Sequence, residues 1–226
     1  MKKVLTVLLI ALLILSAAAC TKKNESDAPA SSSVDLTQWK TLGDIWEYEF
    51  WGSVVEEGTY IRAFKAEDGY YRVETDVPQD VAEKLDAIDF FDKTMEEQEK
   101  ALMKDLPIKT IINLSEVLLS QSDLDALAGK TGQELLDMGF VPQGSNGFST
   151  QEQLSWATLE KGPFVYEVTF QEYVDVDDDP NIAAVIRPLT VKSVTFSGVS
   201  QYATEKAFDI NGGKSLADYE AMFSGD

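Results

Sequence analysis

Closely spaced carboxylates are the residues of this sequence whose chemistry would be most distinctive. Asp175, Asp177 and Asp179 alternate within the run DVDDDPN, and alternating Asp side chains open the loops that bind calcium in proteins. Such a loop also needs glycine at its sixth position and glutamate at its twelfth, where this chain has Pro180 and Ile186. We therefore predict a solvated hairpin loop and no metal site, with weak cation binding by the three aspartates as the alternative.

Other carboxylates come in pairs that glycoside hydrolysis could use. That reaction needs two carboxyl groups about 5–10 Å apart in a cleft, and sequence positions alone give no such distance. The chain also has no histidine, which removes the commonest general base, the Ser-His-Asp and Cys-His arrangements, and the ordinary zinc sites. We expect no catalytic residues and no cofactor, and a carboxylate-based hydrolase is the least favoured alternative. The pairs are Glu56 with Glu57, Asp89 with Asp92, and Glu167 with Glu172.

The chain is strongly acidic, because 39 acidic residues outnumber 19 basic ones and give a net charge of −20. Such a charge repels nucleic acid and anionic lipid surfaces, so we predict no nucleic-acid partner. The charge could provide an acidic face for a basic partner or for cations. Solubility is the simpler interpretation, and we favour it.

The first twenty residues indicate where the protein works. Two lysines precede an almost unbroken apolar run from Val4 to Leu15, and small residues then lead to Cys20. This order is typical of a secretory signal peptide. The apolar run is also well short of the roughly 20 residues that a membrane-spanning helix needs. We predict that residues 1–19 are a signal peptide; simple secretion after an A-x-A cleavage site and a short retained anchor are the alternatives.

The end of this segment resembles a bacterial lipoprotein precursor, in which cysteine follows the cleavage site and its thiol carries diacylglycerol. Ala18, Ala19 and Cys20 match that pattern, whereas Ala17 stands where the family usually has leucine. The resemblance implies lipidation of Cys20 and attachment to the extracytoplasmic face of the cell membrane. Cys20 is the only cysteine, so the chain forms no internal disulfide.

The rest of the chain predicts an α+β fold, with antiparallel hairpins and sheets separated by helices. Residues 20–33 are small and polar, as in a flexible linker. Residues 34–208 form the predicted globular body, and residues 209–226 a loose C-terminal tail. Near the start of the body, Trp46 and Phe50 belong to an alternation of aromatic and acidic residues that predicts a strand with a buried aromatic face. A platform for sugar rings is the alternative.

Two stretches of the body echo one another and suggest an internal duplication. KTLGDI begins at Lys40 and KTGQEL at Lys130, and a predicted hairpin follows each. Pseudo-repeats would span residues 35–106 and 107–208; chance similarity of capping and turn chemistry is the alternative. The pattern from Gly129 to Gly139 is also similar to the G-x-T-x-x-x-[LV]-x-x-x-G stretch of small exported modules of the β-lactamase-inhibitor-protein and outer-membrane-assembly lipoprotein type. That resemblance implies a helix-plus-sheet binding module and assigns no functional residue.

These features predict a non-enzymatic, lipid-anchored module at the cell surface that binds a protein or polymer. A small-ligand or cation-binding accessory lipoprotein is the second hypothesis, ahead of the hydrolase. A deep pocket lined by tyrosine, tryptophan and paired carboxylates would favour the alternatives. A body with one open sheet face would favour the binding module.

Overall fold

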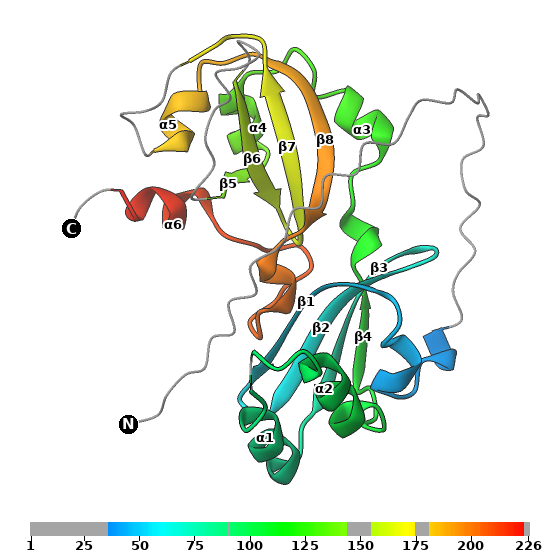
Figure 1. The fold of residues 1–226 in the computed structure, drawn as a ribbon. Helices are drawn as coiled ribbons and strands as arrows, with labels where there is room; N and C mark the ends of the chain where they lie inside the picture. Colours follow the sequence, from blue (N-terminus) through cyan, green and yellow to red (C-terminus); the bar gives the residue numbers. More distant parts are fainter. Residues whose placement is uncertain (1–35, 90, 144–154, 175–180, 224–226) are drawn as a thin grey trace.

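The computed structural model describes residues 36–89, 91–143, 155–174 and 181–223. Two four-stranded antiparallel sheets lie one above the other in Figure 1, each with helices packed against it. The predicted α+β fold of antiparallel hairpins and helices is confirmed. We call residues 36–113 the first module; the second module is residues 118–199 together with the later helix α6 (Leu216–Ala221).

The first sheet is a meander of three long strands completed by a short fourth strand. Strands β1 (Glu49–Glu56), β2 (Thr59–Ala66), β3 (Gly69–Asp76) and β4 (Thr110–Asn113) lie in sequence order. Glu57 and Gly58 connect β1 to β2 with φ angles of 47° and 77°. Two successive positive φ values suit the right-handed twist of a tight hairpin, and glycine adopts them at no steric cost.

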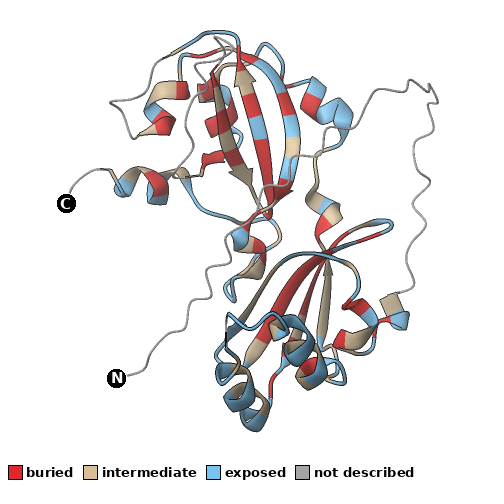
Figure 2. Cartoon of the chain, viewed as in Figure 1, coloured by how far each residue is buried: buried red, intermediate tan, exposed pale blue. Residues whose placement is uncertain are grey.

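Short helices cover one face of the first sheet. The 3-10 helices η1 (Leu36–Gln38) and η2 (Leu42–Ile45) precede β1, whereas α1 (Gln79–Asp86) and α2 (Met95–Met103) lie between β3 and β4. Figure 2 shows that α1 and α2 are largely exposed, and Met103 is the only buried residue described in the two helices. Aromatic side chains dominate the core of this module, whose buried members include Trp39, Leu42, Ile45, Trp46, Tyr60, Phe64, Tyr71, Val73 and Met103.

The second sheet has the larger core. Strands β5 (Val141–Pro142), β6 (Trp156–Lys161), β7 (Phe164–Phe170) and β8 (Val191–Val199) again lie in sequence order. The 3-10 helix η3 (Leu114–Val117) leads from the first module into it. Helices α3 (Gln121–Asp125), α4 (Gly132–Asp137), α5 (Ile182–Ile186) and α6 (Leu216–Ala221) contribute buried residues to the same cluster as one face of the sheet.

The first module opens with a helical turn that is tied to the last part of the module. The amide of Leu42 donates to the carbonyl of Leu106 at 3.0 Å, and the amide of Ile108 donates to the carbonyl of Lys40 at 2.8 Å. The carboxylate of Asp44 accepts the amide of Thr41 at 2.8 Å. This capping hydrogen bond satisfies a donor that the turn would otherwise leave free, and it lowers the pKa of Asp44.

The second module opens in the same way. The amide of Gly132 donates to the carbonyl of Leu189 at 2.8 Å, and the amide of Val191 donates to the carbonyl of Lys130 at 2.7 Å. The carboxylate of Glu134 accepts the amide three residues before it, again at 2.7 Å. The two stretches that echo one another in sequence therefore hold matching places in the two modules.

The boundary between the modules lies later than the sequence pattern suggests. The repeats were expected to meet between residues 106 and 107, yet β4 follows that point and pairs with β3. Tyr71 pairs with Asn113 and Glu74 with Thr110, so β4 completes the first sheet. The short strand, with two isoleucines between Thr110 and Asn113, carries no local sign of which sheet it joins.

The end of the chain is also better packed than a loose tail from residue 209 would be. Helix α6 begins after Ser215, whose hydroxyl accepts the amide of Asp218 at 3.0 Å. Tyr219 on this helix is fully buried in the second module's core. Gly212 and Gly213 before the helix favour a loose tail, but the burial of Tyr219 holds this segment against the core.

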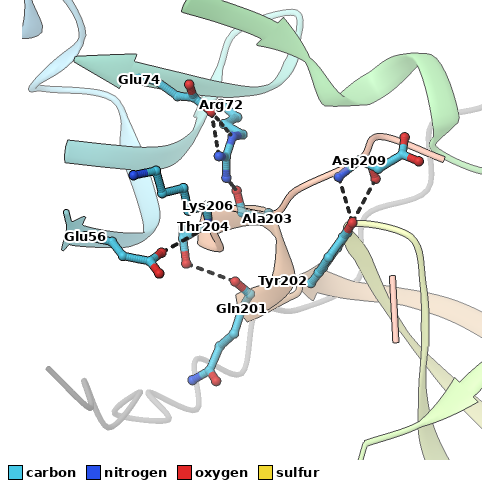
Figure 3. Close-up of polar contacts among 9 residues, drawn as sticks. All are labelled: Glu56, Arg72, Glu74, Gln201, Tyr202, Ala203, Thr204, Lys206 and Asp209. Atoms are coloured by element: carbon cyan, nitrogen blue, oxygen red, sulfur yellow. Dashed lines mark hydrogen bonds and ion pairs between the residues drawn. The ribbon is translucent and has the colours of Figure 1, made fainter. Parts of the chain in front are cut away.

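A junction segment, residues 200–209, joins the two modules (Figure 3). It contains the 3-10 helix η4 (Gln201–Thr204), which contacts β1 and β2. The fully buried Arg72 of β3 donates from Nη1 to the carbonyl of Ala203 and places its guanidinium 4.7 Å from the ring centre of Phe208. The other side of the guanidinium donates to the Glu74 carboxylate at 3.2 and 2.6 Å.

Aromatic rings of the two sheets also contact one another directly. The Tyr70 ring centre lies 5.7 Å from that of Phe164 and 5.2 Å from that of Phe196, both in the second sheet. Trp51 lies against Gly198, where an added Cβ would come within 2.9 Å of the indole. A larger residue there would therefore have to displace the Trp51 indole.

We expect Gly132→Ala to lower the free energy of unfolding by about 1–3 kcal/mol, because core overpacking costs that much. The new Cβ would lie 2.0 Å from the carbonyl oxygen of Ile186, a backbone atom that cannot rotate away. Urea denaturation would measure the loss. Gly52→Ala is the matched control, since its Cβ would make an ordinary 3.5 Å contact with Thr204. Equal losses in the two variants would contradict the steric explanation.

Candidate interaction surface

Four residues singled out in the sequence lie outside the described residues. They are Cys20, Asp175, Asp177 and Asp179, so lipidation and cation binding remain predictions. Within the described ranges, no group of three or more His, Cys, Asp or Glu side chains could hold a metal ion. None of the helices described is long and apolar enough to cross a membrane.

One carboxylate of each predicted pair already accepts hydrogen bonds from other groups of the chain. Glu57 forms an ion pair with Lys206 at 2.7 Å, and Asp92 accepts the amide two residues after it at 2.8 Å. Glu172 accepts both the amide and the hydroxyl of Thr190, at 2.6 and 2.7 Å. These hydrogen bonds lower the pKa of each of the three carboxyls. None of the three therefore resembles a general acid, whose pKa would be raised.

A shallow groove of about 410 Å³ runs between α1 and α2. Its polar side chains already have partners: Lys84 donates to Asp80 at 3.1 Å, and Gln98 donates to Asp92 at 3.1 Å. The groove therefore offers a ligand mainly apolar contact and little to orient it. Its lining consists of Lys84, Ala87, Ile88, Gln98, Ala101 and Leu102.

One face of the second sheet is open in the described part of the chain. The helices of this module join the core on the opposite face, and that core contains none of the residues that point to this side. Glu167 is exposed at the centre of the open face, opposite Thr158 on β6 and Thr195 on β8. The face is mostly polar, and its members include Trp156, Thr158, Glu167, Thr169, Ser193 and Thr195.

Strand β1 carries the densest group of exposed apolar side chains. Phe50, Trp51 and Val55 are 39%, 37% and 41% exposed, and they are three of the seven large hydrophobic residues exposed in the described ranges. The register places Phe50 and Val55 on the helix-covered side of the sheet, opposite Phe64 and Tyr60. Trp51 occupies a bulge and lies on the other side of the sheet, with its ring centre 6.2 Å from that of Tyr70. Apolar groups on both sides of one outer strand are typical of an interaction surface.

A buried arginine holds this surface in place. The guanidinium of Arg62 lies between two rings, 4.7 Å from the centres of Trp46 and of Phe50. It donates to the carbonyl of Trp46 at 3.2 Å and to the hydroxyl of Tyr60 at 3.3 Å. Stacked and hydrogen-bonded, Arg62 fixes the orientation of Phe50 although that ring is partly in solvent.

The aromatic arrangement around β1 was only partly predictable from the sequence. The alternation of aromatic and acidic residues predicted a strand with a buried aromatic face, and Trp46 is indeed buried. However, the strand begins only at Glu49, and Phe50 is exposed. Adjacent Phe50 and Trp51 were the available signal, because neighbouring strand residues point to opposite faces and cannot share one core.

Glu99 of α2 is partly buried beside the same cluster. The Tyr60 hydroxyl and the Arg62 charge lower its pKa, but burial is the larger influence and the net effect raises the pKa above the ordinary value of 4.5. The folded protein therefore binds this proton more tightly than the unfolded chain does. The resulting stabilisation is full at pH values below 4.5 and is lost as the pH rises through the raised pKa.

We accordingly expect Glu99→Gln to change the pH dependence of stability. Glutamine stays neutral, so the variant should gain stability relative to the unmodified protein as the pH rises from about 4 to 7. Thermal unfolding at several pH values would measure the difference. Glu97→Gln, on an exposed part of the same helix, is the control and should follow the unmodified protein. A constant difference between Glu99→Gln and the unmodified protein would contradict the expectation.

Comparisons of the chain with protein-family models, curated proteins and solved structures gave no match. The fold and the surface therefore define the class by themselves: a two-module α+β protein with an exposed aromatic outer strand.

Proposed function

We propose that this chain is a non-enzymatic, lipid-anchored binding module on the extracytoplasmic face of the cell membrane, where it holds a protein or polymer partner. The observation that carries the binding role is β1, an outer strand with exposed Phe50, Trp51 and Val55. Water-exposed apolar groups gathered on one strand are stabilised when a partner covers them. The open polar face of the second sheet offers a further contact area.

Support for the anchor comes from the first twenty residues. Their apolar run and small residues lead to Cys20, the only thiol in the chain. Because the body is acidic, it is repelled by anionic lipid, so the anchor and not the body would hold the protein at the membrane. Each buried CH₂ of a lipid contributes about 0.8 kcal/mol, so two or three chains suffice for firm attachment.

Metabolic labelling with a fatty-acid analogue tests the anchor. The label should enter the protein and disappear in the Cys20→Ser variant, which should also leave the membrane fraction. Absence of label, or label that survives the substitution, would exclude lipidation at this position.

Cross-linking on intact cells tests the binding role. Phe50→Thr with Val55→Thr should reduce capture of the cross-linked partner, because threonine keeps the strand propensity while removing apolar surface. Phe91→Ser is the control, since Phe91 is 89% exposed but lies between α1 and α2, away from β1. Unchanged capture by the double variant would show that β1 is not the binding surface.

A further inference from the structure

We propose that the outer edge of β1 accepts an extended polypeptide segment with basic residues near both its ends, which adds to the first sheet as another strand. This inference rests on the proposed binding function and specifies the kind of partner that its surface takes. It depends on three properties of β1: its free edge, its exposed side chains and its charge.

The edge of β1 is available for pairing. Among the described residues, β1 pairs with β2 alone, because it is the first strand in the order β1-β2-β3-β4. A bulge at Trp51 interrupts the register, but pairing with β2 is regular from Gly52 to Glu56. An outer strand presents a row of unpaired amides and carbonyls, which an added strand satisfies by main-chain hydrogen bonds.

The side chains of β1 favour a partner with apolar residues on both faces. Phe50 and Val55 extend the helix-covered face, whereas Trp51 lies on the other face against Gly198. An added strand that alternates sides would place its own side chains beside these three. Because Arg62 stacks on Phe50, this part of the edge is already ordered before a partner arrives.

The charge of β1 selects a basic partner over a second copy of this chain. Glu49 and Glu56 stand at the two ends of the eight-residue strand, which contains no lysine or arginine. Of the lysines near this strand, Lys100 pairs with Glu47 and Lys206 with Glu57, whereas Lys65 of β2 stands across from Glu49 on the inner side and leaves the outer edge without a basic residue.

A symmetric dimer would have to pair β1 with its own copy in antiparallel orientation. Each Glu49 would then approach a Glu56 of the other copy, and like charges across strands are destabilising. Basic residues at both ends of an incoming segment would instead face both carboxylates favourably.

A synthetic peptide tests the proposal on the full-length protein in mild detergent. The probe has eight residues to match the eight of β1, with lysine at both ends and valine between, so that apolar side chains lie on both faces. Hydrogen exchange should slow in β1 when the peptide binds, because new hydrogen bonds protect its outward amides. A peptide N-methylated at its central residues keeps both charges but cannot donate these bonds, and it should bind at least about tenfold more weakly.

Charge reversal provides the second arm of the test. Glu49→Lys with Glu56→Lys should weaken binding of the lysine-ended peptide by about tenfold and should favour a glutamate-ended peptide instead. Both substitutions are at exposed strand ends, and circular dichroism would verify the fold.

Several outcomes would overturn the inference: no binding of the probe, equal binding of the N-methylated peptide, protection outside β1, or peptide preference unchanged by charge reversal. Self-association through β1, seen by sedimentation and lost in the charge-reversed variant, would identify a second copy as the occupant and would also overturn it. If cell-surface capture still depends on Phe50 and Val55 while these arms fail, the binding function stands and only the strand-addition inference is lost.

Discussion

Arg72→Ala should lower the free energy of unfolding by about 3–5 kcal/mol, the cost of removing one partner from a buried charged network. Arg72 is fully buried and makes two hydrogen bonds to Glu74 and one to the carbonyl of Ala203 (Figure 3). Alanine would remove the donor to the carbonyl of Ala203 and to the partly exposed Glu74 carboxylate, and would also open a void beside Phe208. Chemical denaturation followed by intrinsic fluorescence would measure the loss.

The physical cause can be separated from a general effect of losing a positive charge. Lys109→Ala removes an exposed ion pair with Asp76, and exposed pairs contribute only about 0–1 kcal/mol. Arg72→Lys should recover only part of the stability, because an ammonium group cannot reproduce the two-pronged contact with Glu74. Equal effects of Arg72→Ala and Lys109→Ala would show that the buried network does not hold the modules together.

This variant also reports on how the two modules are coupled. Arg72 belongs to the first sheet, whereas Ala203 and Phe208 belong to the junction segment that follows the second sheet. If this contact joins the modules, its removal should separate a single unfolding transition into two. A variant that stays fully cooperative despite a large loss of stability would place the coupling in the aromatic contacts of Tyr70 instead.

Tyr219→Ala is expected to have an effect of similar size, about 3–5 kcal/mol, as for other large buried aromatic side chains cut back to alanine. The Tyr219 side chain is fully buried, its ring centre lies 5.1 Å from that of Phe223, and its hydroxyl accepts the amide of Ile182 at 3.1 Å. The variant therefore loses apolar burial and also leaves a buried amide without its acceptor. Thermal and urea denaturation would both show it.

Two controls divide that effect into its parts. Tyr219→Phe keeps the ring and removes the hydroxyl, and should cost about 1–3 kcal/mol. Tyr173→Ala removes a tyrosine that is largely exposed and should change stability by about 0.5 kcal/mol or less. A stability loss below about 1 kcal/mol for Tyr219→Ala would restore the interpretation of residues 209–226 as a loose tail.

Features that depend on a few neighbouring residues could be predicted from the sequence alone. Thr131 and Glu134 form the capping box that their spacing predicts, because each satisfies the other's backbone amide within one helical turn. The hairpin around Gly162, with φ of 56°, follows from the same local chemistry. The echo between the stretches at Lys40 and Lys130 was visible because both repeat this capping pattern.

Which of these pieces share a core depends on contacts that form only in the folded chain. Gly69 shows the difference: it lies in the hairpin predicted after the Lys40 stretch, yet its φ is not positive, and an added Cβ would lie 2.4 Å from the Ser115 hydroxyl that accepts the amide of Tyr70. The sheet that β4 joins, the burial of Tyr219 and the exposure of Phe50 likewise depend on contacts between residues far apart in the chain. Hydrophobic burial is nondirectional, so an apolar residue specifies that it should be covered but not by what.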